Sequence, residues 1–154
     1  MMLFFIWIGR VINRNLVKED EDMPQYEIKY IELKTGYRDD GPAWIGRVKK
    51  DKSGNTIYFN YKAFQKHIGT NSNFFDVESG DGYWISGIKK DGCDRHWTGK
   101  GKITIDQKII PEYLSITGEK ELDLRRFVVV DIVECFPEER IHGLQNAKNT
   151  MKDA

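Results

Sequence analysis

Residues 43–60 read AWIGRVKKDKSGNTIYFN, and this stretch decides the class of fold. It contains two short runs rich in apolar, β-branched and aromatic residues, 43–49 and 56–60, which are typical of β-strands. The segment between them, KDKSGN, consists of the charged and small residues that form hairpin loops. The stretch therefore predicts a β-hairpin, and further short segments of the same kind lie on both sides of it along the chain.

The composition describes one globular domain. The chain has 154 residues, of which 40% are hydrophobic and 31% charged, unlike a disordered or membrane-spanning protein. Lys and Arg number 24, as do Asp and Glu, so no overall field draws the protein to nucleic acid or acidic lipid. Two cysteines exclude a disulfide framework and a zinc site made of cysteines alone. We therefore expect a soluble, cytoplasmic protein.

Three blocks of the chain differ in character. Residues 1–22 begin with a short apolar run and end with EDED. The run is shorter than the roughly 20 apolar residues that span a bilayer, and it lacks the features of a signal peptide. We predict an N-terminal extension produced by an over-long start, with a membrane-surface anchor as the alternative. Residues 23–118 are predicted to form the β domain, and residues 119–154 to add a strand and a C-terminal helix.

Residues 26–34, YEIKYIELK, alternate between apolar and polar side chains. The apolar positions change from even to odd numbers after Tyr30, and such a phase shift predicts a β-bulge. Short strands at close spacing, separated by glycine-rich turns, favour a barrel or sandwich. The sequence thus predicts a mainly β fold: a small, antiparallel, partly closed (SH3-like) barrel with short helices and a C-terminal helix.

Three further segments carry predictions of their own. Residues 61–67 are predicted to form one or two helical turns. Residues 110–117 are predicted to form a short helix, because Pro111 suits its first turn and Gly118 suits the position after its end. Residues 127–136, FVVVDIVECF, are almost wholly apolar, which predicts a strand that is buried on both faces or paired centrally.

Asp91 and Gly92 lie between two strand-like runs in YWISGIKKDGCDRHWT, residues 83–98. An Asp-Gly pair favours a two-residue type I′ turn, in which both central residues have a positive φ. That turn fixes the register and puts Trp84 and Trp97 on the same face of a hairpin. We predict that this face belongs to the core, because it carries the large apolar groups.

The opposite face of this hairpin carries the ionisable side chains. His96 is predicted to stand opposite Gly87, which leaves open space beside the imidazole, with Asp94 and Tyr83 nearby. An aspartate can orient an imidazole, and a histidine can move a proton at neutral pH. The alternative is that Gly87 allows a neighbouring strand to pack closely. Lys89 is predicted to form a cross-strand ion pair with Asp94.

Arg95 falls on the tryptophan face, where it is predicted to stack on an indole, unless the turn is longer than two residues. The sequence TGKGK at 98–102 is either a phosphate cradle of backbone N–H groups or a bend between strands. The candidate catalytic residues are Asp94 and His96. The candidate binding residues are Tyr83, Gly87, Lys89, Asp94, Arg95, His96, Lys100 and Lys102.

Two other patterns are weaker. Cys93 and His96 have a C-x-x-H spacing, but His67, Cys135 and His142 are scattered, so neither a metal site nor a cofactor is expected. Aromatic and basic residues alternate between positions 49 and 66, as in proteins that bind single-stranded nucleic acid. Aromatic residues in strands are mostly core, however, and the neutral overall charge argues against such binding.

Four strings stand out within residues 30–118: YIELKTGYRDDGPAWIGRV, SGNTIYFNYKAF, YWISGIKKDGCDRHW and GKITID. In this order they resemble a family of small uncharacterised bacterial proteins. The resemblance implies no established activity, so no catalytic residue follows from it. Residues 1–22 and 119–154 lie outside it, in agreement with their interpretation as additions.

The sequence thus favours a non-enzymatic binding module that engages a protein or nucleic-acid segment through the polar face of the hairpin. The alternative is a small enzyme, a hydrolase or a protein acting on phosphate esters, that uses Asp94 and His96. A third hypothesis is an assembly protein in which residues 127–136 pair with a strand of another chain. No membrane span is expected, and the oligomeric state is left open.

Overall fold

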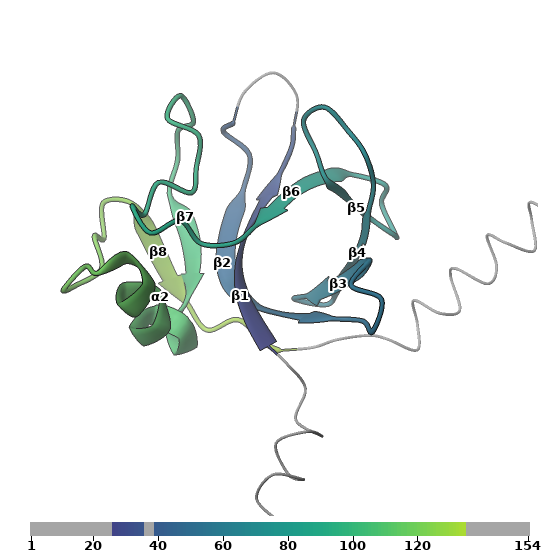
Figure 1. Cartoon of the computed structure of the whole chain (residues 1–154). Helices are drawn as coiled ribbons and strands as arrows, with labels where there is room; N and C mark the ends of the chain where they lie inside the picture. The colour runs from purple at the N-terminus through teal and green to yellow at the C-terminus, as the bar shows by residue number, and fades with distance from the viewer. Residues whose placement is uncertain (1–25, 36–38, 135–154) are drawn as a thin grey trace, which may run out of the picture.

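The computed structural model describes residues 26–35 and 39–134. Figure 1 shows the order of the elements within these ranges. They are β1 (Tyr26–Leu33), β2 (Ala43–Lys50), β3 (Thr56–Phe59), β4 (Lys62–Lys66), β5 (Phe74–Asp76), β6 (Gly82–Ser86), β7 (Ile103–Asp106), the short 3-10 helix η1 (Gln107–Ile109), α2 (Ile110–Thr117) and β8 (Phe127–Val130).

The first six strands form a closed antiparallel barrel. Neighbouring strands follow the order β1-β6-β5-β4-β3-β2, and β1 also pairs with β2, from Tyr26 opposite Lys49 to Glu32 opposite Ala43. This last pairing closes the ring, so that the strands inside it have no long open edge. The predicted mainly β, antiparallel barrel is confirmed, and the hairpin predicted at 43–60 is formed by β2 and β3.

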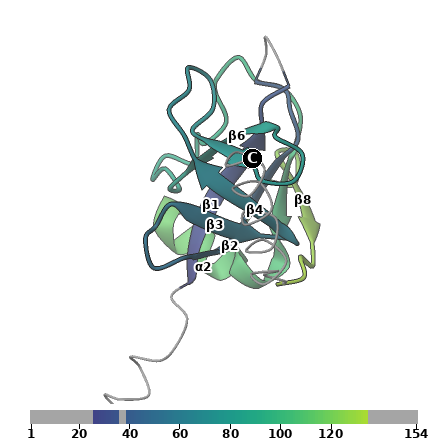
Figure 2. The ribbon, with the colours of Figure 1, turned by 90° about the vertical axis from the view of Figure 1, so that its right-hand side faces the viewer.

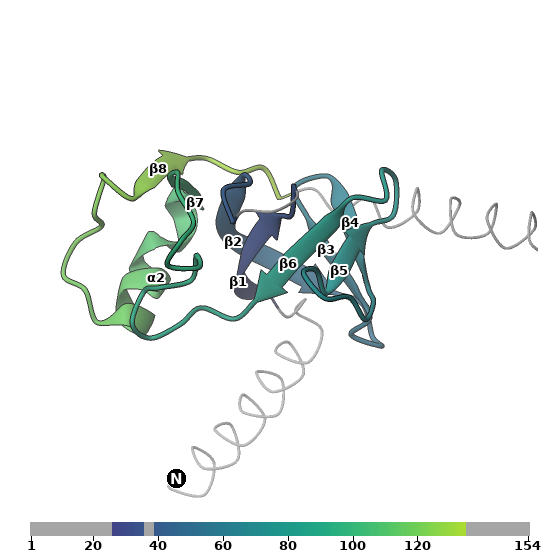
Figure 3. The ribbon, with the colours of Figure 1, turned by 90° about the horizontal axis from the view of Figure 1, so that it is seen from above.

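Strands β7 and β8 extend the barrel on one side. β7 pairs in parallel with Trp44 and Ile45 at the start of β2, whereas β3 pairs with Lys49 and Lys50 at its end. β8 pairs in parallel with β7, and η1 and α2 form the crossover that a parallel pair requires. Seen from above, β7, β8 and α2 lie at one end, β3 to β6 at the other, and β1 and β2 between them (Figure 3).

Strand β1 serves two hydrophobic cores because both of its faces are covered. Ile28 and Tyr30 belong to a core shared with β7 and α2, whereas Ile31 belongs to the barrel interior together with Phe64. Viewed from the barrel side, α2 lies behind the barrel strands (Figure 2). The change of apolar positions along 26–34 therefore reflects two covered faces. The register with β2 is continuous, so the predicted β-bulge is wrong.

Two other predicted elements differ from the structure. Most of residues 61–67 form strand β4 instead of helical turns, because the chain reverses at Asn60 and Tyr61. Their φ values of 46° and 65° are those of a type I′ hairpin turn. The apolar strand of 127–136 is likewise not central: β8 pairs only with β7 in the described part of the chain, and Val128 is 45% exposed.

The helix predicted at 110–117 is confirmed, with a proline in the first turn of α2 and Gly118, at φ 74°, capping its end. The predicted N-terminal extension, the C-terminal helix and the end of the 127–136 run lie outside the described residues. Among the helices in 26–35 and 39–134, none has the length and apolar character needed to cross a membrane.

Candidate functional site

The sixteen residues 87–102, which connect β6 to β7, contain most of the candidate site residues and form no strand. The Gly92 N–H donates to the Lys89 carbonyl oxygen at 3.0 Å and closes a four-residue turn. Of the Asp91–Gly92 pair only Gly92 has a positive φ, 71°, whereas a type I′ turn needs two. The predicted hairpin and its register are therefore wrong: the turn that forms runs from Lys89 to Gly92, with Lys90 and Asp91 as its two central residues, and no strand follows it before β7.

In this loop, aspartate side chains accept hydrogen bonds from backbone N–H groups that would pair with a facing strand in a hairpin. Asp91 accepts a hydrogen bond from the Cys93 N–H at 2.9 Å, and Asp94 accepts one from the Lys89 N–H at 2.8 Å. Short aspartate side chains compete with strand pairing in this way. The predicted Lys89–Asp94 contact thus exists, but it uses the Lys89 backbone instead of its ammonium group.

The two indoles do not lie in the core. Trp84 is 39% exposed and Trp97 is 88% exposed. On β6 the intervening residues, Tyr83 and Ile85, fill the barrel interior, and the Tyr83 ring lies 4.6 Å from that of Phe64 between centroids. The predicted assignment of faces is therefore reversed on β6: Tyr83 and Ile85 face the barrel interior, whereas Trp84 faces outward.

Arg95 fastens the loop to the barrel. Its side chain is 9% exposed, and Nη1 lies 3.0 Å from Oε1 of Glu32, a β1 residue that is 2% exposed. Arg95 also donates to the carbonyl oxygens of Asp39 at 2.6 Å and Gly41 at 3.0 Å. A buried ion pair with these added hydrogen bonds fixes the position of the guanidinium group. The predicted stacking of Arg95 on an indole is wrong.

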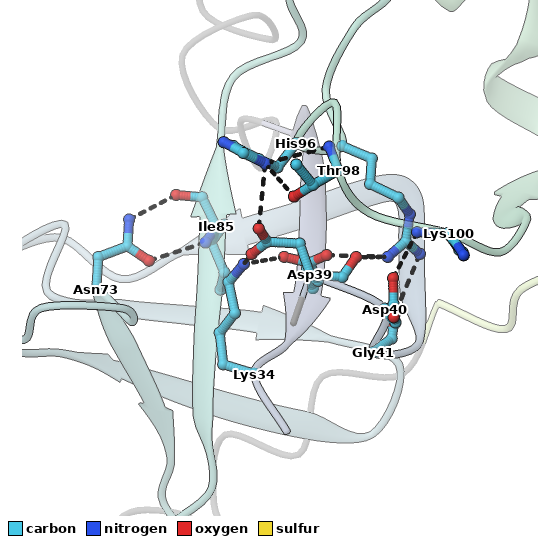
Figure 4. Close-up of polar contacts among 11 residues, drawn as sticks. Lys34, Asp39, Asp40, Gly41, Asn73, Ile85, His96, Thr98 and Lys100 are labelled. Carbon is cyan, nitrogen blue, oxygen red and sulfur yellow. Dashed lines mark hydrogen bonds and ion pairs between the residues drawn. The ribbon is translucent and has the colours of Figure 1, made fainter. Parts of the chain in front are cut away.

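His96 attaches the loop to the same segment through Asp39. His96 Nδ1 lies 3.3 Å from Asp39 Oδ2 and 2.7 Å from Thr98 Oγ1 (Figure 4). The Lys34 ammonium group, 2.6 Å from Asp39 Oδ1, holds the pKa of the Asp39 carboxyl below its ordinary value. Asp39 is therefore ionised at neutral pH and orients the imidazole, the role that the sequence suggested for Asp94.

The glycine-rich end of the loop also packs against residues 39–41. The Lys100 N–H donates to Asp40 Oδ1 at 2.6 Å (Figure 4), so a carboxylate of the protein already occupies this part of the predicted phosphate cradle. A Cβ on Gly99 would lie 2.3 Å from the Asp39 carbonyl oxygen. Only glycine therefore allows this close approach of the two backbones.

The predicted group of Tyr83, Gly87, Asp94 and His96 is not assembled. Tyr83 lies in the barrel core, and Asp94 is 7% exposed. Gly87 does face open space, with no atom within 4 Å of an added Cβ, but Asp39 and Thr98 hold the imidazole of His96. The two candidate catalytic residues thus belong to separate sets of contacts.

A basic pocket of about 610 Å³ lies between this loop, the start of β7 and the turn that leads into β8. Four candidate binding residues line it: Lys89, Arg95, His96 and Lys102. The other lining residues are Cys93, Trp97, Gly99, Gly101, Ile103, Arg125 and Arg126. The lining carries five lysine or arginine side chains and no carboxylate, and we call it the basic pocket below.

The cations of the basic pocket are not equally available. Arg126 donates to a backbone carbonyl oxygen of the loop and so holds the wall together. Arg125 is bound to Asp123 at 3.1 Å, but its side chain is 91% exposed. Lys89 and Lys102 are exposed and form no side-chain hydrogen bond or ion pair with any residue that the structure describes. These two lysines are the charges most free to bind a ligand.

Sequence reasoning missed Arg125, Arg126 and the position of Trp97. The Ile103 N–H donates to the Arg126 carbonyl oxygen at 2.9 Å, which places the two arginines beside the start of β7. The only signal in the sequence is a pair of adjacent arginines directly before an apolar strand. The parallel pairing of β7 with β8, which brings them to the loop, has no local sequence signature.

Four buried polar atoms lie without a hydrogen-bond partner among the described residues: Asp94 Oδ2, Arg95 Nε and the hydroxyl oxygens of Tyr30 and Tyr113. Burial raises the pKa of the Asp94 carboxyl above its ordinary value and raises the pKa of Tyr113 to about 12. The Tyr113 hydroxyl lies 3.4 Å from the position of a Cβ on Gly92, directly under the loop turn. The loop turn therefore covers the hydroxyl group of Tyr113, a residue of α2.

The alternating stretch at 49–66 offers no row of rings. Tyr58 and Phe59 are each 3% exposed, which leaves Tyr61, 55% exposed, at the surface.

No cluster of three or more His, Cys, Asp or Glu residues suits a metal ion within 26–35 and 39–134. Cys135 and His142 lie outside these ranges.

Comparison of the chain with protein-family models, curated proteins and solved structures gave no match. The geometry of the basic pocket is therefore the basis of the functional proposal.

Proposed function

We propose that the protein is a non-enzymatic binding module whose basic pocket binds an anionic segment of another macromolecule. One observation carries this proposal: the pocket gathers five lysine or arginine side chains and no carboxylate, in a chain whose net charge is zero. Positive groups in a concave surface raise the local concentration of anions. Carboxylate oxygens outside the lining lie 3.0 to 3.8 Å from the three arginines and offset their charges, so the positive field of the pocket comes mainly from Lys89 and Lys102.

The way in which the loop is held supports the same proposal. Loops longer than about 12–15 residues without secondary structure are commonly functional. Here Arg95, Gly99 and Lys100 fix the loop to residues 39–41, so one wall of the pocket is preformed. A preformed site loses less entropy when a ligand binds than a mobile loop does. Lys89 and Lys102 therefore extend from a loop whose backbone is held in place.

The test uses the full 154-residue chain and two fluorescent anionic probes, a 12-nucleotide single strand and an acidic peptide of similar charge. We expect at least one probe to bind, and the double variant Lys89→Glu, Lys102→Glu to weaken that binding at least tenfold, measured by fluorescence anisotropy at low salt. The matched control is Lys52→Glu, Lys66→Glu, which reverses two exposed charges outside the pocket, in the stretch at 49–66. Binding that survives the pocket variant, or an equal loss in the control, contradicts the proposal.

A small hydrolase or phosphate-ester-acting enzyme is the second candidate. The raised pKa of the buried Asp94 favours it, because such carboxyls are common at catalytic sites, and His96, two residues later in the chain, lines the pocket. This candidate requires hydrolysis of a simple phosphate ester with a pH profile near the titration of a histidine. The activity has to disappear in His96→Ala.

A further inference from the structure

We propose that the anionic segment is single-stranded nucleic acid, and that the indole of Trp97 is the platform on which one of its bases stacks. The inference rests on the proposed function of the basic pocket and names its ligand. Trp97 lines the pocket and is 88% exposed. An exposed indole remains in contact with water until a flat apolar surface covers it, and the face of a base is such a surface.

The aromatic surface is larger than one ring, and the smaller of its two rings is held in place. The His96 ring lies 5.6 Å from that of Trp97 between centroids, with 35° between the planes. The contacts of His96 with Asp39 and Thr98 fix the imidazole against the barrel side of the loop (Figure 4). The imidazole is therefore held beside an exposed indole, and the two rings together offer more aromatic surface than the indole alone.

The pocket also provides cations that can contact the phosphates beside a stacked base. Lys89, Lys102 and the exposed Arg125 line the same pocket as the indole. Proteins that bind single strands combine stacking rings with a basic groove in this way. An acidic peptide uses the cations but gains nothing from the indole. The faces of bases in a duplex are already stacked, so a duplex gains little from it too.

The size of the site is that of a pocket for a small molecule or for one unit of a polymer. Its volume of about 610 Å³ lies within the range of small-ligand sites. The pocket opens on a loop and not on a helix or a two-stranded ribbon that could enter the groove of a duplex. Single-stranded nucleic acid is thus the polyanion that uses both features of the site.

The experiment compares four probes on the full chain: a mixed-sequence 12-nucleotide single strand, its duplex, a mononucleotide and an acidic peptide of similar charge. We expect the single strand to bind most tightly. Trp97→Ala should weaken its binding about 5- to 150-fold, the range for one stacked base, whereas Trp97→Phe should retain most of it. The matched control is Trp84→Ala, which removes a 39% exposed indole outside the pocket and should leave the affinity unchanged. Three phosphate contacts predict a slope of log K against log salt of about −2.

Each outcome decides between the two proposals. If Trp97→Ala binds the single strand as tightly as the unmodified chain does, while Lys89→Glu, Lys102→Glu does not, the anionic-segment proposal stands and this inference fails. It also fails if the duplex, the mononucleotide or the acidic peptide binds as tightly as the single strand. If no probe binds in a lysine-dependent manner, both proposals fail. Trp97 is exposed, so thermal unfolding should confirm that its substitution leaves the fold intact.

Discussion

The barrel interior and the 87–102 loop are held together by different interactions. The interior is filled by aliphatic and aromatic side chains from alternate positions of paired strands, such as Ile31, Phe64 and Ile85. The loop has little backbone pairing and is fixed by a buried arginine and several carboxylates. Apolar burial depends mainly on area, whereas polar contacts need one partner in one direction. Stability and site geometry should therefore respond to different substitutions.

The largest effect is expected in the barrel. Phe64 is fully buried at 0% exposure, so Phe64→Ala should lower the free energy of unfolding by about 3–5 kcal/mol, measured by urea denaturation. The affinity of the remaining folded protein for the single strand should not change, because Phe64 does not line the basic pocket. Phe64→Leu keeps most of the apolar volume and serves as the milder variant. Weakened binding by folded Phe64→Leu would show that the two regions are coupled.

Arg95 tests the boundary between the two regions. Arg95→Ala removes a cation from the 2% exposed Glu32, and breaking a buried pair costs about 3–5 kcal/mol. We expect the lower end of this range in urea denaturation, because Lys34 remains beside Glu32. Binding of the single strand should weaken as well, since the loop loses its main anchor.

Arg47 offers a matched control for Arg95. Its side chain is 37% exposed and makes a 3.3 Å contact with Glu134, so Arg47→Ala should cost at most about 1 kcal/mol and leave binding unchanged. A loss in Arg95→Ala no larger than in this control would mean that other contacts hold the loop.

The barrel could largely be predicted because its signals are local. The hairpin at 43–60 follows from two strand-like runs around a polar loop, and α2 follows from Pro111 and Gly118. The bulge predicted at 26–34 shows where local reasoning stops. A phase shift in the apolar pattern has the same appearance whether a strand bulges or has both faces covered, and only the arrangement of α2 and the barrel decides between them.

The loop could not be predicted in the same way. Asp91–Gly92 has the sequence of a type I′ turn, yet the type I′ turn lies at Asn60–Tyr61, where strand pairing imposes it. The partners of Arg95 lie 54 to 63 residues earlier in the chain, so no spacing rule connects them. Sequence reasoning found four residues of the basic pocket because they lie in the same loop. It missed the arginines that the parallel β7–β8 pair brings to them.

The smallest effect is expected at Asp94, the buried carboxyl on which the loop turn rests. Burial raises its pKa in the folded protein, so the folded state binds this proton more tightly than the unfolded chain does. The free energy of unfolding should therefore fall as the pH rises from the ordinary aspartate pKa of about 3.9 through the raised value of Asp94. Asp94→Asn keeps the acceptor for the Lys89 N–H and removes the charge.

We expect Asp94→Asn to raise the free energy of unfolding at pH 7, because the amide keeps the acceptor and no longer buries a charge. The gain should shrink as the pH falls toward 4, where Asp94 itself takes up the proton. Urea denaturation between pH 4 and 7 measures both, with Asp91→Asn as the control at an exposed carboxyl of the same turn. A gain that is constant with pH would show that burial of the Asp94 charge is not what lowers the stability of this loop.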